Sequence, residues 1–265
     1  MTRSAVRPAA DGRDSGRAAL VTGAGTRLGE AMARALGAAG FNVAVHYRSS
    51  EAAAARVASE IATSLVTAKP VQADLSDEAS TAGLIAKAVG AVGPLSLLVN
   101  SASAFEADEI ETMTKDSWDL HLNTNLRAPV KLTQDFAAQA VAGRDNLVVN
   151  MIDQRVLKLT PQFLSYTASK AALLAVTKTL AQALGPSGIR VNAIGPGPTM
   201  RNKRQSEDDW RRQNEATILG HGAKPADIVD ALMFFVGAPS VTGQMIAVDG
   251  GQHLVWRTPD VLVNE

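Results

Sequence analysis

The sequence predicts one α/β domain in which helices cover both faces of a parallel sheet. From Ala18 onward, short apolar runs alternate with longer Ala-rich segments, and the runs contain almost no polar alternation. Strands that are apolar at nearly every position are buried on both faces, as in a doubly wound parallel sheet. A chain of 265 residues with 46% hydrophobic residues can bury such a core in a single domain. We therefore expect a Rossmann-type fold.

Seven short apolar runs are the expected strands of this sheet. In chain order they are Ala18–Gly23, Phe41–Tyr47, Pro70–Asp74, Leu95–Asn100, Asn146–Ile152, Ile189–Ile194 and Met245–Asp249. The Ala-rich segments between them have the length and composition of helices. These are Leu28–Ala39, Glu51–Leu65, Ser76–Val89, Trp118–Val141, Ser165–Leu184 and Pro225–Val236.

Two segments fall outside this alternation. Residues 1–17 are polar, Arg-rich and poor in large apolar side chains, so we expect a flexible tail ahead of a single domain at residues 18–265. Residues 195–224 are polar and contain Pro, Gly and Arg, between the sixth strand and the last helix. A loop of roughly thirty residues is more often functional than a simple connection, so we interpret it as a substrate lid.

The composition argues against several classes of partner. Lys plus Arg and Asp plus Glu both number 26 and form no basic block, so nothing indicates binding to nucleic acid or to a membrane. There are no cysteines, and hence no disulfide and no thiolate metal site. Neither a signal-peptide core nor an apolar run of about eighteen residues is present. We expect a cytoplasmic protein that binds a small molecule and no metal.

The first expected strand leads into the Gly-rich sequence VTGAGTRLGEAMARAL, which opens the first helix. Glycines in this setting let backbone amides approach a pyrophosphate at a helix N-terminus. A Gly-rich turn by itself is often only structural, but after the first strand of a strand–helix series it favours a dinucleotide site. The expected cofactor residues in this turn are Thr22, Gly23, Arg27, Leu28 and Gly29.

Tyr166 and Lys170, four residues apart at the start of an Ala-rich segment, share one face of the expected helix. Together with the Gly-rich turn, NTNLRAP and IRVNAIGPGPTM, this pair resembles the short-chain dehydrogenase/reductase family over residues 17–252. The departures from the family pattern are Arg27 for the middle glycine of TGxxxGxG, Asn100–Ser103 (NSAS) for NNAG, and Asp153 for a serine.

The end of the second expected strand, VAVHYRSS, favours NADPH over NADH. An NAD-binding domain usually has an Asp or Glu there for the adenosine ribose, whereas a guanidinium attracts a 2′-phosphate. His46, Arg48 and Ser49 suit the phosphate, although a solvated loop arginine is a plainer alternative. The family resemblance adds further cofactor residues, namely Asp74, Leu75, Asn100, Ser101, Ala102, Pro196 and Gly197.

The family resemblance assigns the chemistry to Tyr166, Lys170 and Asn125. Tyr166 would donate the proton, and because a free tyrosine has a pKa near ~10, it needs the ammonium of Lys170 to stabilise its phenolate. Lys170 would also hold the nicotinamide ribose. Asn125 would anchor a water-mediated proton relay, and a packing amide inside a helix is its alternative interpretation.

Asp153 changes the expected substrate. The usual serine donates a hydrogen bond to a carbonyl, whereas an ionised carboxylate only accepts, so it suits a substrate with ring N–H and amino groups, such as a pterin. Together with Arg27 it resembles the pteridine reductase branch of the family. In that branch the arginine reaches both cofactor phosphate and pterin, and an aromatic residue, here Phe105, stacks the pterin against nicotinamide. Ser103 and Tyr166 would also line the substrate site.

Each of these substrate residues has a plainer alternative. Phe105 could pack in the core, Arg27 could form a surface ion pair, and Asp153 could cap the following turn. Their coincidence favours an NADPH-dependent reductase of a dihydropteridine, dihydromonapterin or dihydrofolate. A 3-oxoacyl-thioester or small-ketone reductase of the same family is the main alternative. A catalytically silent nucleotide-binding sensor is the alternative outside enzymes.

The helices expected at Trp118–Val141 and Ser165–Leu184 carry apolar residues on more than one face, with small Ala residues that allow close approach. The family resemblance implies that these helices pair across a two-fold axis. We therefore expect a homotetramer.

Overall fold

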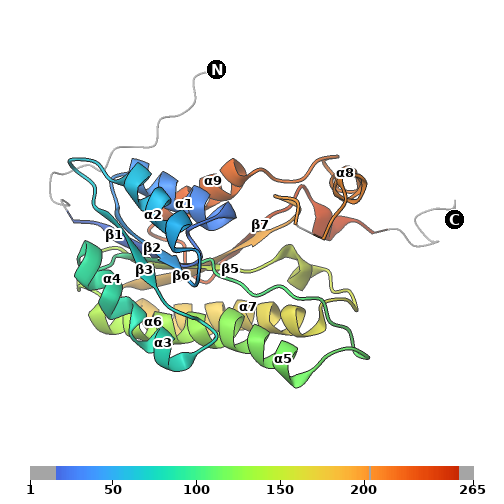
Figure 1. The fold of residues 1–265 in the computed structure, drawn as a ribbon, viewed down its shortest axis with the longest axis horizontal. Coiled ribbons are helices and arrows are strands. Elements are labelled where there is room, and N and C mark those ends of the chain that lie inside the picture. The colour runs from blue at the N-terminus through green and yellow to red at the C-terminus, as the bar shows by residue number, and fades with distance from the viewer. Residues whose placement is uncertain (1–15, 203, 257–265) are drawn as a thin grey trace, which may run out of the picture.

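A computed structural model describes residues 16–202 and 204–256 of the chain. Within them, seven strands form one sheet in which every neighbouring pair is parallel (Figure 1). The strands are β1 (Ala18–Val21), β2 (Asn42–Tyr47), β3 (Ala68–Gln72), β4 (Leu97–Asn100), β5 (Asn146–Met151), β6 (Ile189–Pro196) and β7 (Met245–Val248). Their order is β3-β2-β1-β4-β5-β6-β7, which confirms the predicted fold. The predicted tail lies outside the described residues except for its last two positions.

Helices cover both faces of the sheet, as Figure 1 shows. One layer consists of α1 (Arg27–Ala38), α2 (Glu51–Ile61) and α9 (Pro225–Gly237). The opposite layer consists of α3 (Glu78–Ala82), α4 (Leu84–Val92), α5 (Lys115–Leu122), α6 (Ala128–Gln139) and α7 (Leu164–Leu184). In the described part of the chain, no helix is both long and apolar enough to cross a membrane.

Strand β4 illustrates why the strands lack polar alternation. Leu97 and Val99 lie in the core on the α1, α2 and α9 side, whereas Leu98 lies in the core on the opposite side. Successive side chains of a strand point to opposite faces of the sheet. Because both faces are covered by helices, the strand carries apolar side chains on both faces, and the side chain of its last residue, Asn100, is hydrogen-bonded to Asn150.

Two predicted helices differ from those in the structure. The helix expected at Glu51–Leu65 ends at Ile61, because the Thr63 hydroxyl accepts hydrogen bonds from the amides of Leu65 and Val66 and forms a competing turn. The helix expected at Ser76–Val89 is divided into α3 and α4, which meet at Gly83. Glycine is a weak helix former, so this is the natural position for the break.

The helix expected at Trp118–Val141 is also divided. It starts earlier, with α5, because Thr114 and Ser117 form a capping box. A five-residue π turn, η1 (Asn123–Arg127), then separates α5 from α6. This turn contains Asn125, one of the predicted site residues, which is buried there.

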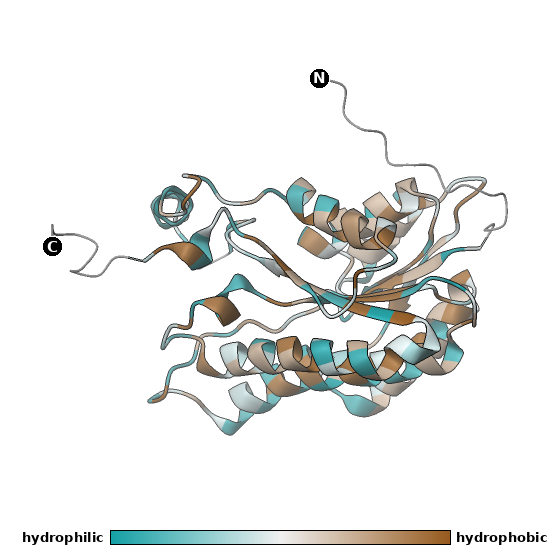
Figure 2. Ribbon diagram, turned by 180° about the vertical axis from the view of Figure 1, so that it is seen from behind, coloured by the Kyte–Doolittle hydropathy of each residue, from teal (hydrophilic) through white to brown (hydrophobic). Residues whose placement is uncertain are grey.

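The predicted lid contains a helix that was not expected from the sequence, α8 (Glu207–Glu215). The Ser206 hydroxyl caps it by accepting a hydrogen bond from the Asp209 amide at 3.0 Å, and acidic residues occupy its first turn. The helix is hydrophilic along most of its length (Figure 2). Trp210 and Gln213 on this helix line the main cleft of the molecule. The function of the segment as a lid stays a prediction.

Candidate active site

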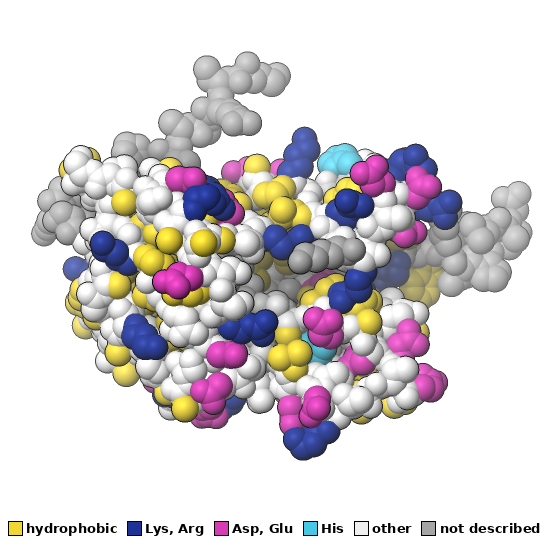
Figure 3. Space-filling model, viewed as in Figure 1, with side chains coloured by type: hydrophobic (Ala, Val, Ile, Leu, Met, Phe, Trp, Pro, Cys, Tyr) yellow, Lys and Arg dark blue, Asp and Glu magenta, His cyan; other side chains and the backbone are white. Residues whose placement is uncertain are grey.

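A cleft of about 710 Å³ opens where the strand order changes direction between β1 and β4. Open parallel sheets bind ligands at such switch points, outside the carboxyl ends of the strands. Figure 3 shows the hollow between the helix layers, with Lys and Arg side chains at its edge. Most predicted site residues line it, namely Gly23, Arg27, Leu28, Gly29, His46, Arg48, Ser49, Asp74, Leu75, Ser101, Ala102, Ser103, Phe105, Asp153, Tyr166, Lys170, Pro196 and Gly197.

Two predicted cofactor residues, Thr22 and Asn100, lie behind the wall of the cleft instead. The Thr22 hydroxyl accepts hydrogen bonds from the amides of Ser101 and Ala102, at 2.8 and 2.9 Å. The Asn100 side chain donates to the side-chain oxygen of Asn150 at 2.8 Å, between neighbouring strands. Both residues therefore support the loops that form the wall.

Asn125 also lies behind the cleft, in the π turn η1. Its Oδ1 accepts hydrogen bonds from the Ala104 amide and the Ser103 hydroxyl at 2.8 and 3.1 Å. Its Nδ2 donates to the Ala104 carbonyl and the Ser169 hydroxyl at 3.0 and 3.1 Å. The side chain thus ties the loop after β4 to α7, and π turns recur at functional sites. Its role in a proton relay stays a prediction.

The Gly-rich turn brings backbone closer to backbone than a side chain would allow. A Cβ on Gly29 would lie 2.2 Å from the Gly23 carbonyl oxygen, and one on Gly23, whose φ is +65°, would lie 3.0 Å from Ala102 Cα. The first residues of α1 line the cleft, where the free amides of a helix N-terminus attract anions. This arrangement is a cradle for a phosphate group.

Arg27 stands at the start of α1 in a left-handed conformation, with a φ of +55°. A residue with a side chain is held in this conformation at a cost on the order of 1–3 kcal/mol, which glycine avoids. The Arg27 guanidinium donates to the carbonyls of Met200 and Arg201 at 2.9 and 3.1 Å. Arg27 therefore joins the Gly-rich turn to the predicted lid. Its expected contacts with cofactor and pterin stay predictions.

His46 requires a correction. It is 2% exposed, its Nδ1 accepts a hydrogen bond from the Gly23 amide at 3.0 Å, and its Nε2 lies 3.1 Å from the Ala73 carbonyl. Burial lowers the pKa of His46 from 6.5 to about 4, so the ring is neutral at pH 7. It therefore supports the Gly-rich turn through its hydrogen bond with the Gly23 amide, and it cannot present a positive charge to a 2′-phosphate.

We predict that His46 makes the protein less stable at acid pH. The pKa of His46 is lower in the folded state, so its contribution is fully present above pH 6.5 and is lost as the pH falls toward about 4. At 1.36 kcal/mol per pKa unit, this interval corresponds to about 3 kcal/mol. Urea unfolding near neutral pH and near pH 4 measures the loss. The loss should be smaller in His46→Gln, and equal losses in both proteins would contradict the role.

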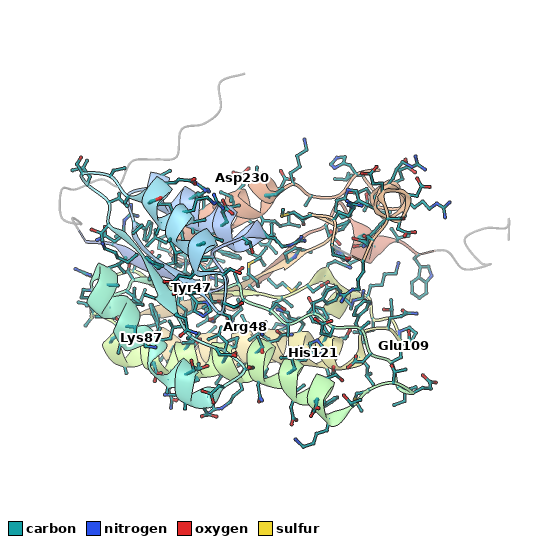
Figure 4. The ribbon with its side chains drawn as sticks, in the orientation of Figure 1. Tyr47, Arg48, Lys87, Glu109, His121 and Asp230 are labelled. Atoms are coloured by element: carbon teal, nitrogen blue, oxygen red, sulfur yellow. The ribbon has the colours of Figure 1, made fainter. Side chains whose placement is uncertain are left out.

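Arg48 and Ser49 lie just beyond the carboxyl end of β2, and both are exposed at the cleft (Figure 4). After β3, the Ser76 hydroxyl and amide donate to Asp74 at 2.7 and 2.9 Å, which lowers the pKa of this carboxyl group. The charge of Arg48 also contributes to lowering the pKa of the nearby Asp74 carboxyl group. The exposed guanidinium of Arg48 thus lies at this end of the cleft.

At the other end of the cleft, Tyr166 and Asp153 are joined directly. The Tyr166 hydroxyl donates to Asp153 Oδ2 at 2.8 Å. Tyr166 is 6% exposed, and burial together with the charge of Asp153 raises the pKa of the hydroxyl well above its usual range. Burial also raises the pKa of Asp153. The tyrosine therefore keeps its proton and directs it at the carboxylate.

Asp153 also caps the short helix η2 (Gln154–Leu157), since its Oδ1 accepts a hydrogen bond from the Arg155 amide at 2.8 Å. Capping and facing the cleft were alternatives at the level of sequence. Oδ1 caps the short helix and Oδ2 accepts the hydrogen bond from Tyr166 in the cleft, so Asp153 has both roles.

Lys170 is buried beside this pair. Its Nζ donates to the Met151 carbonyl at 2.8 Å and lies 5.8 Å from the centre of the Tyr166 ring. Burial lowers the pKa of Lys170 to about 8, so it is mostly charged at neutral pH. We expected this charge to lower the pKa of Tyr166. In the structure the carboxylate of Asp153 is hydrogen-bonded to the hydroxyl, and its effect has the opposite sign.

Three polar residues that the sequence did not single out form a buried network next to Tyr166. His121 Nδ1 lies 2.7 Å from the Ser165 hydroxyl, which donates to Asp108, and His121 Nε2 accepts from the Glu106 amide at 3.0 Å. His121 projects from α5 toward α7 (Figure 4). The network holds the loop after β4 against the start of α7. In the sequence, the one feature that connects this network to the site is that Ser165 directly precedes Tyr166.

Phe105 lies in the cleft and belongs to neither core of the sheet. Its ring stacks on Phe163 with ring centres 4.5 Å apart and meets the edge of Tyr166 at 4.6 Å. Phe163, which the sequence did not single out, has a left-handed φ of +58° directly before α7. An aromatic surface therefore continues outward from the tyrosine.

Known proteins resemble the chain over most of its length. The family model described as enoyl-(acyl carrier protein) reductase matches residues 23–253. FolM alternative dihydrofolate reductase 1 from Brucella canis, crystallised with NADP, has a TM-score of 0.89 at 44% identity, over 93% of this chain and 98% of that chain. The 3-oxoacyl-[acyl-carrier-protein] reductase FabG of Staphylococcus aureus is 30% identical, over 90% and 98% of the two chains. L-xylulose reductase of Bos taurus is 34% identical, over 91% and 98%.

Proposed function

The chain belongs to the short-chain dehydrogenase/reductase family, and on that premise we propose that it reduces a pterin: dihydrofolate, dihydromonapterin or another dihydropteridine. It is an NADP-dependent oxidoreductase, and its cofactor is NADPH, in keeping with the two similar FolM structures, from Brucella canis and Brucella suis, that contain NADP. The residues of the cleft carry the substrate proposal.

The cleft fits a dinucleotide phosphate. Gly23 and Gly29 form the phosphate cradle, whose space a Cβ would fill. Arg48 and Ser49 would hold the 2′-phosphate, and Lys170 would hold the nicotinamide ribose. When bound, NADPH supplies the hydride for the reduction. All other groups that the reaction needs belong to the chain itself.

The direct pairing of Tyr166 with Asp153 is the observation that carries the substrate proposal. A carbonyl substrate gains a hydrogen bond from the serine that is usual at this position, but an ionised carboxylate offers no donor to it. A pterin offers ring N–H and amino groups that the carboxylate can accept. A charged hydrogen bond of this kind contributes about 1.5–3 kcal/mol.

The same pair accounts for the proton that the reaction consumes. Reduction of a pterin C=N bond adds a hydride to the carbon and a proton to the nitrogen. The Tyr166 hydroxyl donates the proton. Asp153, 2.8 Å away, then passes a proton from solvent to the tyrosine, since its raised pKa favours taking one up. Lys170, charged below about pH 8, stabilises the negative charge left on the tyrosine.

NADPH oxidation with a panel of substrates tests the proposal. Dihydrofolate, dihydromonapterin and dihydrobiopterin should be reduced with kcat/KM at least ~10-fold above an acetoacetyl thioester, as the loss of one charged hydrogen bond implies. Rapid turnover of the thioester, with every pterin left unchanged, would exclude pterin reduction.

A 3-oxoacyl-thioester or small-ketone reductase is the second candidate. It is favoured by the matched family model and by the relatives FabG and L-xylulose reductase. Against it stands the carboxylate of Asp153, because an ionised carboxylate offers no hydrogen-bond donor to the oxygen of a ketone or thioester. The substrate panel separates the two candidates.

We predict a preference for NADPH that depends on Arg48. Arg48→Asp places a carboxylate where the 2′-phosphate would bind and should reduce the NADPH preference at least ~10-fold, because an attractive charge is replaced by a repulsive one. Comparison of kcat/KM for NADPH and NADH measures this. An exposed arginine elsewhere, such as Arg211→Asp, serves as the control, and equal use of both cofactors by the parent enzyme would contradict the prediction.

We also propose a homotetramer in which α5, α6 and α7 form the interfaces. These helices belong to one outer layer of the molecule, and Trp118 on α5 keeps 39% of its surface exposed. Light scattering at micromolar concentration should give four times the mass of the chain. A monomer mass would reject this assembly.

A cytoplasmic location is likewise a proposal. It is supported by the use of NADPH, a cofactor that cells keep within the cytoplasm and organelles.

A further inference from the structure

His121, on α5, is fully buried, and both nitrogens of its ring are hydrogen-bonded. A backbone amide can only donate, so Nε2 accepts from the Glu106 amide at 3.0 Å and Nδ1 carries the proton of the ring. Nδ1 therefore donates to the Ser165 hydroxyl, 2.7 Å away. Because burial lowers the pKa of His121, the ring is neutral at neutral pH and keeps this one arrangement of donor and acceptor.

The chain of hydrogen bonds continues from Ser165 to a buried carboxylate. The Ser165 hydroxyl and amide donate to the two carboxylate oxygens of Asp108, which is 2% exposed. Burial opposes the charge of Asp108, but the hydrogen bonds from Ser165 and from the Ser117 hydroxyl outweigh it and lower the pKa of this carboxyl group. The donors of Glu106, His121 and Ser165 therefore all point toward one negative charge, and hydrogen bonds aligned in this way strengthen one another.

The two links of His121 lead to the immediate neighbours of two rings that meet in the cleft. Glu106 follows Phe105, and Ser165 precedes Tyr166. The rings of Phe105 and Tyr166 meet edge to face, with centres 4.6 Å apart. His121, which projects from α5 toward α7 (Figure 4), also packs against Tyr166, with ring centres 6.0 Å apart. The hydrogen bonds of His121 therefore help to fix one ring relative to the other.

Asn125, four positions after His121 in the chain, makes a parallel connection. Its side chain accepts from the Ala104 amide at 2.8 Å and donates to another serine of α7, Ser169, at 3.1 Å. Both His121 and Asn125 are 0% exposed. Phe105 therefore lies between two backbone amides that are held by buried side chains, one on each side of it.

We propose that His121 is a positioning residue for the reduction: it holds the segment that carries Phe105 in place beside Tyr166 and thereby sets the affinity for the substrate. His121 is fully buried and is not among the residues that line the cleft, so it acts through its two hydrogen bonds. If the segment moves, substrate binding weakens while the proton donor stays in place. The inference rests on the proposed pterin reduction, because a flat substrate beside Tyr166 would bind against the Phe105 ring.

Two substitutions separate the two hydrogen bonds of His121. The amide of a glutamine reaches the position of Nε2 and keeps an acceptor for the Glu106 amide, whereas that of an asparagine reaches the position of Nδ1 and keeps a donor for Ser165. His121→Asn should raise KM for dihydrobiopterin about fivefold or more, the worth of one neutral hydrogen bond, with smaller changes in kcat and in the Kd of NADPH. His121→Gln should keep KM close to that of the parent. Both variants lose the imidazole, so each is the control for the other.

Hydrogen–deuterium exchange of the NADP-bound enzyme tests the same bond without turnover. The Glu106 side chain is 63% exposed, yet its amide should exchange slowly in the parent because His121 holds it. Exchange of this amide should be faster in His121→Asn and unchanged in His121→Gln. The Ser165 amide, which donates to Asp108, should stay protected in both variants.

The outcomes distinguish this inference from the proposed function. If the parent reduces no pterin, the proposed function fails, KM is compared with the substrate that the panel identifies, and the exchange measurement still decides the role of His121. Equal changes of KM in the two variants would show that His121 only fills space, and would overturn the inference. Fast exchange of the Glu106 amide in the parent would overturn it even if neither variant folds.

Discussion

Asp153→Ser is expected to lower kcat/KM for a pterin between about ten- and more than a hundredfold, while NADPH affinity and Tm stay close to those of the parent. The substitution removes the carboxylate and with it the proposed hydrogen bonds to the N–H groups of the pterin, which are worth about 1.5–3 kcal/mol. The fold should tolerate the change, because serine can cap η2 in place of Asp153 Oδ1 and because one buried carboxylate is removed. Reduction of a simple ketone should suffer less and should rise if the serine donates to the carbonyl.

Asp153→Asn is the matched control for shape. It keeps the size of the side chain and the cap at η2, but it places an amide opposite the Tyr166 hydroxyl and can neither carry a negative charge nor return a proton. It should therefore lose pterin reduction as severely as the serine variant, without any gain in ketone reduction. If both variants keep pterin activity while their melting temperatures fall, Asp153 is only a structural cap and the substrate assignment is wrong.

Gly29→Ala is expected to have the second large effect, a loss of NADPH affinity of about a hundredfold and a fall in Tm of several degrees. The added Cβ would lie 2.2 Å from the carbonyl oxygen of Gly23 and 3.0 Å from the Cα of Ala24. Both neighbours are backbone, so the phosphate cradle itself must move. Overpacking of this kind costs typically about 1–3 kcal/mol. Fluorescence titration with NADPH and a thermal melt measure the two effects.

Gly25→Ala is the control in the same turn. A Cβ there would meet its nearest atom, the Ala54 amide nitrogen, at 3.4 Å, which is ordinary contact. Both glycines line the cleft, so a difference between the variants reports the backbone clash and not the mere loss of a glycine. If Gly29→Ala binds NADPH as tightly as Gly25→Ala does, the turn is not the phosphate site.

The fold was predictable because its signals are local and repeated. The strands β1, β4, β5 and β6 are buried on both faces, and this leaves mostly apolar runs that can be recognised without any contact information. The edge strands β3 and β7 are partly exposed. The boundaries were less predictable where a single side chain competes with the helix. Thr63 ends α2 early, and Asn125 accompanies a π turn in a segment that looks like one helix. Such contacts decide boundaries and have no periodic signature.

The cleft-lining residues were predictable where a short motif carries them. The Gly-rich turn and the pair Tyr166 and Lys170 have a recognisable spacing, and the parallel sheet places them at one edge of the sheet. His46 shows the limit of this approach. It lies at the strand end that the sequence predicts to select the cofactor, but its imidazole is directed to the Gly23 amide and the Ala73 carbonyl. A sequence states which residue is present at a strand end, and not which way its ring is held.

The sequence by itself determined the architecture, the family and the cleft-lining segments, because all three follow from periodicity and from residues close together in the chain. Only the tertiary structure decided which atoms meet. Tyr166 donates to Asp153 across thirteen positions, and Arg155 and Arg204 reach Phe163 from separate segments. The direction of a side chain depends on the packing of distant residues around it. The charges of Asp153, Tyr166 and Lys170 depend in turn on that burial, which no local pattern in the chain specifies.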